Sequence, residues 1–570
     1  MFKIFLTIVI SMLYAAQLNA QKVLKENQTK QISTFYDFNK TKIMARGKYY
    51  VDQFGETTEE HGKWTYYDRY GEIEEVRNYY KGRLNGEVSL YYPNGKIRQQ
   101  GFFKFEAQDS IYKEWYENGK LKVKGQYNLD EPTGNWEYYY LDGKMKSVEE
   151  VRGKDNYIWQ FYLPDSTHQH ILIDGTGELV TYYTTGRVKE WYNYKNGLKH
   201  GAFEEYSVYD HLTVKGFYKE GIKDSSWVFN YVTGDLEKTC FYSEGKLDGD
   251  YRYYYDNGQL NVVGQYKEGK KDGEWTWFTN KGTSDMQGSF ENDLQHGHWT
   301  YWRPTGELSY KAHFNKGLKD GEWTYFYITG DVFKQGTFEN DLRNGTWETW
   351  YEDGTLLMTG KYVNEKEEGE WLNYWDSGEL KNSASFTGGR LDGKWESYYP
   401  TGRLKLSGEY KDNLKVGEWT DYFSNGRAKD ITNYKLFKKK SKMDYTPIYK
   451  NHIVMESRKN GTFKSFSDKD YKVTEEGNYK DDEKDGEWIA YYPGGKFPAV
   501  VSTYKEGKLH GKMKQFSRRG KLLQEMSYRD GLKHGKTIIY DKRGKVLKEV
   551  NYEFGQQAIE GGAGSFSPGK

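Results

Sequence analysis

A repeat of 24 residues runs through this chain. Tryptophan recurs at that interval at Trp275, Trp299, Trp323, Trp347, Trp371, Trp395 and Trp419. The same interval leads back to Tyr251, Trp227 and Phe203. A fixed period in this range is typical of a repeat array, in which neighbouring units stabilise one another, and not of a globule built around one active site.

One repeat has the pattern of a β-hairpin. With the tryptophan numbered as position zero, residues 273–278 form a strand-prone run, 280–282 a turn and 287–290 a second run. Glycine recurs at position seven (Gly258, Gly282, Gly306, Gly330, Gly354, Gly378, Gly402, Gly426) and an aromatic residue at position fifteen (Tyr266, Phe290, Phe314, Phe338, Tyr362, Phe386, Tyr410, Tyr434). Glycine at position seven supplies the positive φ of a tight turn. Asp-Gly, Asn-Gly or His-Gly pairs before each tryptophan, such as His296-Gly297, predict a second tight turn that joins consecutive units.

The composition agrees with an all-β fold. Aromatic residues make up 18% of the chain, with 63 glycines, whereas disordered chains lack aromatic residues. We therefore expect an elongated repeat array of antiparallel β-hairpins that form a twisted single-layer meander sheet. The formal net charge is only +1, which argues against a nucleic-acid partner.

The repeat template divides the chain into segments. The predicted segments are a signal peptide (1–20), an N-terminal cap (21–60), hairpin repeats (61–435) that are irregular near 150–175, an irregular insertion or degenerate repeat (436–475), further repeats (476–552) and a flexible tail (553–570).

The N-terminus predicts export. Lys3 precedes a short apolar stretch from Ile4 to Tyr14, and small residues precede a cleavage point before Gln21. A membrane anchor is the alternative, but the apolar stretch is short for a bilayer, and no later segment reaches spanning length. Cys240 is the only cysteine and is expected to be a buried, inert thiol. An exported chain of this size without disulfides is expected to be bacterial, located in the periplasm, at the outer membrane or outside the cell.

The repeat pattern resembles the MORN-repeat variant of bacterial proteins. Residues 393–404, with Trp395, a Tyr pair and Gly402, followed by Gly408 and Tyr410, carry the resemblance, which covers most of 61–552. It implies hairpins in an elongated, twisted sheet. Members of that family are often labelled antitoxin-like, and others act as scaffolds or contact membranes or lipids. The family has no catalytic motif to carry over.

No catalytic, cofactor-binding or metal-binding residue is predicted. His61, His200, His296, His510 and His534 all precede position zero by three residues, where other units have Asp or Asn. Residues that exchange in this way are typical of turns, and neighbouring units are about 10 Å apart, too far for one metal ion. Glutamates before the tryptophans recur without singling out an acid–base pair. An enzyme would have to reside in 436–475.

Aromatic residues at position three are the candidate binding surface. By strand alternation, positions zero and four are expected on one face and position three on the other. The predicted stripe consists of Phe278, Trp302, Phe326, Trp350, Tyr374, Tyr398 and Tyr422. These rings either pack on one another as a structural stripe or remain partly open as a ligand groove.

Three functions remain open at this stage. The first is a non-enzymatic, exported scaffold of the cell envelope that binds a protein partner without a cofactor. The second is a glycan or cell-wall binder, since stacked rings suit sugars, and contact with a membrane surface is also possible. The third is an antitoxin-like immunity protein. A signal peptide does not fit this role, because toxin–antitoxin pairs act in the cytoplasm. The breaks near 150–175 and 436–475 are expected to carry special contacts.

Overall fold

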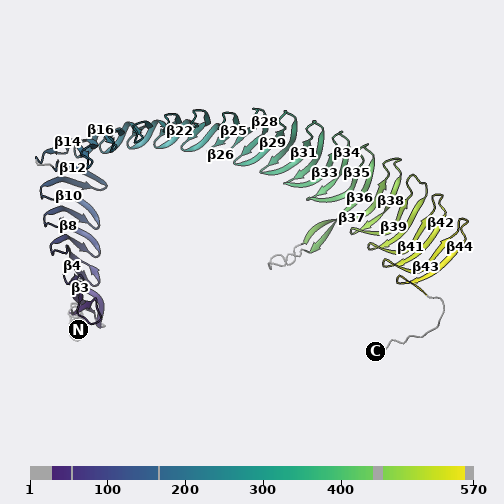
Figure 1. Ribbon diagram of the computed structural model, residues 1–570, viewed down its shortest axis with the longest axis horizontal. Helices are drawn as coiled ribbons and strands as arrows, with labels where there is room; N and C mark the ends of the chain where they lie inside the picture. The colour runs from purple at the N-terminus through teal and green to yellow at the C-terminus, as the bar shows by residue number, and fades with distance from the viewer. Residues whose placement is uncertain (1–27, 53–54, 165–166, 441–452, 559–570) are drawn as a thin grey trace, which may run out of the picture. The chain divides into compact units, whose positions relative to one another are not determined.

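A computed structural model describes residues 28–52, 55–164, 167–440 and 453–558. These residues form 45 strands and no helix. They divide into two compact units, Met1–Lys270 and Lys271–Lys570. Within each unit, strands that follow one another in the sequence pair antiparallel (Figure 1), so the predicted all-β hairpin meander is confirmed. The predicted signal peptide lies outside the described residues.

The first unit contains the strands β1 (Gln28–Phe35), β2 (Ile43–Asp52), β3 (Gly55–Tyr67), β4 (Ile73–Tyr80), β5 (Arg83–Leu84), β6 (Gly86–Tyr91), β7 (Ile97–Lys104), β8 (Ala107–Trp115), β9 (Leu121–Asn128), β10 (Glu131–Tyr139), β11 (Met145–Arg152), β12 (Asp155–Tyr162), β13 (His170–Ile173), β14 (Thr176–Tyr182), β15 (Val188–Lys195), β16 (Leu198–Tyr206), β17 (Leu212–Lys219), β18 (Ile222–Asn230), β19 (Leu236–Ser243), β20 (Lys246–Tyr254) and β21 (Leu260–Lys267).

The second unit contains the strands β22 (Lys270–Phe278), β23 (Ser284–Glu291), β24 (Leu294–Trp302), β25 (Leu308–Asn315), β26 (Leu318–Lys319), β27 (Gly321–Phe326), β28 (Val332–Glu339), β29 (Leu342–Trp350), β30 (Leu356–Val363), β31 (Lys366–Tyr374), β32 (Leu380–Thr387), β33 (Arg390–Tyr398), β34 (Leu404–Lys411), β35 (Leu414–Tyr422), β36 (Ala428–Lys440), β37 (Ile453–Phe466), β38 (Val473–Lys480), β39 (Glu483–Tyr491), β40 (Pro498–Lys505), β41 (Lys508–Phe516), β42 (Leu522–Arg529), β43 (Leu532–Tyr540), β44 (Val546–Glu553) and β45 (Gln556–Gln557).

The turn predicted at position seven is present. The Tyr351 amide donates to the Thr355 carbonyl at 2.8 Å, and the Gly354 amide donates back to the Tyr351 carbonyl at 3.0 Å. Gly354 has a φ of 85°, which a side chain would strain. A turn closed by a left-handed glycine is a common short hairpin connection. It joins the two strands of each repeat.

The second predicted turn is in the wrong place. The Gly288–Trp299 and Ser289–His296 pairs leave Gly297 and His298 as extra residues, so the His-Gly pair forms a bulge inside β24. The chain reverses earlier, at Asn292 and Asp293, whose φ values are 54° and 70°. Two consecutive residues with positive φ make a type I′ turn, whose twist matches that of the flanking strands. Glycine with positive φ occurs in both bulges and turns. The His-Gly pair therefore predicted a turn where the structure has a bulge.

The bulge sets which side chains share a face. Positions zero and two lie on the same face, as the stacked rings of Trp275 and Trp277 show, with centroids 5.7 Å apart. Position four leaves the strand and enters the turn, because a second bulge lies between positions two and three. The expectation that positions zero and four share a face is therefore wrong.

The core is a row of tryptophans on that face. Trp299 is 1% exposed and lies flat on the backbone of Gly288. Phe290 contacts Trp299 edge-on with ring centroids 5.1 Å apart. The indole N–H of Trp299 donates to the Ser289 carbonyl at 3.2 Å. Equivalent tryptophans recur in most repeats, so aromatic packing between neighbours replaces a central core.

Lysines and a thiol complete this core. The Lys223 ammonium lies 4.2 Å from the centroid of the Trp227 ring, and Lys415 lies 4.0 Å from that of Trp419. Cys240 is 4% exposed, and burial raises the pKa of its thiol. The prediction that this thiol is buried is confirmed.

Both irregular regions contain additional strand pairing. Near 150–175, β12 and β13 form an extra hairpin, and the Ile158 amide donates to the Gly197 carbonyl at 2.7 Å. In 436–475, β36 and β37 pair as a lengthened hairpin (Figure 1), and residues 441–452 lie outside the described part. The repeat resumes at Phe463, whose ring stacks on Trp488 at 5.5 Å.

The ends of the chain also contain paired strands. Within the predicted cap, β1 pairs with β2 and β2 with β3. Within the predicted tail, β45 pairs with β44. Residues 559–570 lie outside the described residues.

Alkaline pH is expected to destabilise the fold. Burial, the largest cause in each case, raises the pKa of Tyr112, Tyr138, Tyr251 and Tyr310 from 10.0 to about 12. A raised pKa stabilises the folded state below pH about 10, and that stabilisation is lost as the pH rises from about 10 to about 12. The lysines over the rings have the opposite effect on stability as the pH rises, because burial lowers the pKa of Lys223 and Lys415.

The buried tyrosines outnumber these lysines, so the tyrosine effect is expected to dominate. Urea unfolding followed by circular dichroism should give a free energy of unfolding that falls across this window. Stability that stays flat to pH about 12 would contradict the prediction.

Candidate functional site

The predicted stripe lies at the turn end of the strands. All seven rings (Phe278, Trp302, Phe326, Trp350, Tyr374, Tyr398 and Tyr422) are the last residues of their strands, and all are half-buried. They project to the face opposite the tryptophan core, where the Tyr398 hydroxyl donates to Glu396 at 2.9 Å. Burial, with a smaller contribution from this hydrogen bond, raises the pKa of Tyr398 to about 12.

A tyrosine ladder runs beside this stripe. The hydroxyl of a position-four tyrosine donates to the carbonyl of the position-three residue in the next repeat. Tyr351 makes this bond to Tyr374 at 3.0 Å, and Tyr399 makes it to Tyr422 at 2.8 Å. The same bond is made by Tyr92, Tyr116, Tyr183, Tyr231, Tyr327 and Tyr492. Each rung ties two repeats together and covers the slot between their turns.

The ladder is interrupted at Ser207. This position-four residue cannot reach the next repeat, and a cavity of about 460 Å³ opens between the two turns. Its lining includes the position-three ring of Tyr206 and the position-two ring of Phe229, together with Ser207, Val208, Tyr209, Val214 and Val232. Val208, Tyr209 and Val232 are 47%, 70% and 66% exposed. Exposed apolar side chains around a hollow are typical of an interaction site.

The Ser207 cavity offers mainly apolar surface. The Tyr206 hydroxyl donates to Glu204 at 2.6 Å. This bond and burial raise the pKa of Tyr206 to about 12, so the phenol stays neutral at neutral pH. Glu205 and Glu237 also line the cavity. An aliphatic or aromatic group fits these walls, and the carboxylates suit a cationic neighbour of that group.

Another repeat without a position-four tyrosine has Ser517. A cavity of about 320 Å³ opens there, lined by Ser517, Arg518, Arg519, Lys521, Leu523 and Lys542. It has the same place in the repeat as the Ser207 cavity, because Lys542 and Val232 both occupy position five of the following repeat. Its walls carry four cationic side chains beside Leu523, so the two cavities share a place in the repeat but differ in charge.

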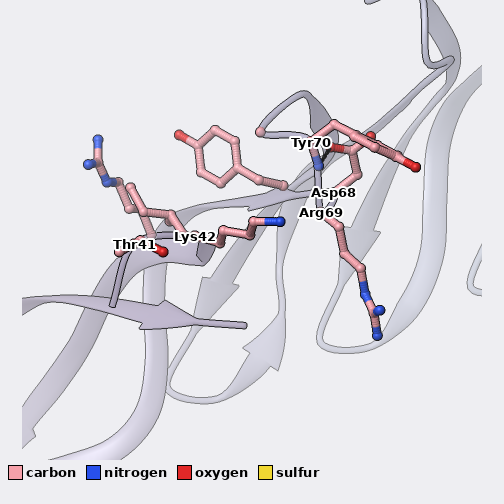
Figure 2. A pocket seen from close by; sticks show the side chains of 9 residues that line it. Thr41, Lys42, Asp68, Arg69 and Tyr70 are labelled. Atoms are coloured by element: carbon pink, nitrogen blue, oxygen red, sulfur yellow. Dashed lines mark hydrogen bonds between the residues drawn. The ribbon is translucent and has the colours of Figure 1, made fainter. Parts of the chain in front are cut away.

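A third cavity lies near the start of the described chain, with a volume of about 290 Å³. Figure 2 shows Lys42 extending toward the turn of Asp68 and Tyr70, while the Arg69 side chain points away. The Asp68 carboxylate accepts the Tyr70 amide at 2.8 Å and the Glu72 amide at 3.0 Å, which fixes the turn. This cavity lies beside the β1–β2 hairpin and not in a ladder slot.

The five histidines that precede position zero contact residues other than one another. The His510 imidazole lies 3.3 Å from the Asp530 carboxylate, and the His534 ring lies 4.7 Å from the Phe554 ring. In the ranges that the structure describes, no three His, Cys, Asp or Glu side chains come together as metal ligands. The described residues also contain no helix long and apolar enough to cross a membrane.

The family of the chain follows from its repeats. A family model described as the MORN repeat variant matches residues 84–105, 108–129, 247–268, 295–316, 343–364, 391–412, 509–530 and 533–553. The chain contains repeats of the MORN-repeat variant family. Each match begins four residues before position zero and includes the turn at position seven, so the family repeat is the hairpin described above.

Other comparisons add little. No curated protein matches this MORN-repeat protein. Crystal structures of TcdB2-TccC3-Cdc42 and of TcdB2-TccC3 without its hypervariable C-terminal region align with 93% and 92% of the chain at 10% identity, with TM-scores of 0.11 and 0.12. The chain spans 31% and 35% of those proteins. TM-scores this low do not establish a shared fold.

The aromatic stripe predicted from the sequence does not include the residues that line the cavities. Tyr206 is also a position-three ring, but it lies before the stretch that the stripe covers, and Phe229 is a position-two ring. The available signal was at position four, where Ser207 and Ser517, like Thr279 and Ser467, replace the usual tyrosine. That signal has meaning only once the tyrosine is known to reach into the next repeat.

Proposed function

We propose that this MORN-repeat protein is a non-enzymatic, exported scaffold of the cell envelope that binds a protein partner at the Ser207 cavity. The supporting observation is the gap in the tyrosine ladder, which leaves an apolar hollow flanked by exposed Val208, Tyr209 and Val232. Tyrosine and aliphatic side chains around a hollow are suited to hold an apolar anchor residue of a partner.

The rigidity of the surrounding repeats supports this proposal. Tyr183 closes the slot before the cavity through its bond to the Tyr206 carbonyl at 2.8 Å. Tyr231 closes the slot after it through its bond to the Tyr254 carbonyl at 2.7 Å. The cavity is therefore held open between two locked repeats, which lowers the ordering cost of binding.

Export rests on residues 1–20 of the sequence. Mass spectrometry of the protein from its own cells is expected to give a mature N-terminus at Gln21. An intact Met1 in the mature protein would contradict the exported part of the proposal and leave the binding part standing.

Filling the slot is expected to abolish partner binding. In Ser207→Tyr, the new hydroxyl can reach the Asn230 carbonyl as the other ladder tyrosines reach theirs, and the ring occupies the cavity. We expect a partner captured from cross-linked envelopes by the wild-type protein to be reduced at least about tenfold with the variant. Quantitative mass spectrometry of the captured proteins measures this.

Thr279→Tyr is the matched control, because it adds the same side chain at position four of another repeat. It should leave capture unchanged. Equal capture by the wild type and Ser207→Tyr would show that the partner does not bind at the Ser207 cavity. Retention in polysaccharide fractions without any protein partner would favour a glycan binder instead.

A further inference from the structure

The Ser517 cavity combines a ladder gap with an unbalanced positive charge. Its lining carries four cationic side chains, those of Arg518, Arg519, Lys521 and Lys542, and no acidic one. All four residues are exposed. The whole chain is almost neutral, at +1, so this local excess is a property of the site and not of the composition.

The cations are positioned but not neutralised. The Lys521 ammonium donates to the Lys542 carbonyl at 3.0 Å, across the slot that a tyrosine would otherwise close. The Arg518 guanidinium lies 5.7 Å from the centre of the Tyr492 ring. Among the described residues, none of these four side chains forms an ion pair with a carboxylate.

The Asp541 carboxylate in the neighbouring turn accepts hydrogen bonds from its own turn and not from the four cationic side chains. The Asp541 carboxylate accepts the Arg543 amide at 2.7 Å and the Lys545 amide at 2.8 Å, which holds its own turn together. The Arg543 and Lys545 side chains add further positive charge beside the cavity, and both residues are exposed. The site therefore has a positive potential that attracts an anion.

We propose that the Ser517 cavity binds the phosphate group of an anionic ligand. Arginine presents paired N–H donors that match phosphate oxygens, and the four positive charges of two arginines and two lysines exceed the two negative charges of a phosphate ester. The serine hydroxyl supplies a neutral donor. The volume of about 320 Å³ accommodates the phosphate with part of its carrier. This site is separate from the apolar Ser207 cavity and does not depend on the partner proposed there.

Calorimetric titration of the purified protein with inorganic phosphate and with glycerol phosphate tests the proposal. The wild type should bind both, more weakly as salt is added. Ser517→Tyr, which restores the usual residue and fills the slot, should weaken binding at least about tenfold. Arg519→Gln, which leaves the backbone and the slot intact, should also weaken it. Ser207→Tyr is the control and should bind as the wild type does.

Vesicles of phosphatidylglycerol or of phosphatidylcholine distinguish the source of the phosphate. Loss of phosphatidylglycerol binding in Ser517→Tyr, together with loss of free phosphate binding, identifies a lipid headgroup as a ligand. Binding of soluble phosphate alone identifies a soluble ligand. The proposal is overturned if the wild type binds neither form, or if Ser517→Tyr and Arg519→Gln bind phosphate as tightly as the wild type while keeping its circular dichroism.

Discussion

Replacing Trp347 by alanine is expected to lower the free energy of unfolding of its repeat by about 3–5 kcal/mol. The indole is 2% exposed and contacts the Phe338 ring edge-on at 5.2 Å and the Tyr362 ring at 6.3 Å. Its N–H donates to the Thr337 carbonyl at 3.1 Å. Alanine removes these contacts and leaves a void that the paired strands cannot close, because their backbone spacing is fixed by hydrogen bonds.

The loss should be local. In a repeat array each unit contacts only its neighbours, so destabilisation spreads to adjacent hairpins and fades beyond them. Hydrogen exchange followed by mass spectrometry should show lost protection in β28, β29 and β30, with β8–β10 unchanged. Uniform loss along the chain, or no loss in β28–β30, would contradict the packing described here. A tyrosine substitution at Trp347 is the matched control and should cost less, since Tyr251 fills position zero in another repeat.

Replacing Gly336 by valine is expected to cost about 2–3 kcal/mol by overpacking. A Cβ atom on Gly336 would lie 2.1 Å from Cδ2 of Trp347, so the indole must move away from the strand on which it lies flat. The φ of Gly336 is not in the left-handed region, and the penalty is therefore steric and not conformational. Unfolding by urea, followed by tryptophan fluorescence and by hydrogen exchange, measures the cost.

Alanine at the same position is the graded control. The chain itself has Ala312 in one buried cluster with Trp323, which is still only 5% exposed, and Ala384 paired with Trp395, which is half-buried. One methyl group is thus accommodated, and Gly336→Ala should cost about 1 kcal/mol.

A double-mutant cycle separates the clash from other effects. Valine at 336 should cost much less when Trp347 is already alanine, because the indole that it strikes is gone. Equal costs of Gly336→Val in both backgrounds would show that the glycine is needed for another reason.

Much of the fold could be predicted from the period alone. Glycine at position seven correctly marked the turn inside each hairpin, because only a left-handed residue closes that turn. The connection between repeats could not be placed, because His296-Gly297 and Asn292-Asp293 are both turn-like pairs and local sequence does not distinguish a bulge from a reversal. Pairing with the neighbouring strand decides between them.

The candidate site was less predictable than the fold. The aromatic stripe at position three was visible in the sequence, and its rings are indeed half-buried on one face. Its role in binding remains a prediction. The Ser207 and Ser517 cavities were not visible, since each depends on a tyrosine hydroxyl that would cross to a residue about 23 positions away.

The sequence by itself determined the hairpin, the period and the row of core tryptophans, because strand alternation and turn chemistry are local and repeat with the residues. Only the tertiary structure decided which turn connects the repeats, which positions share a face and where the slots between turns stand open. Those features arise from contacts between neighbouring hairpins, whose strand register is set by the bulges and whose slots are closed by the tyrosine ladder.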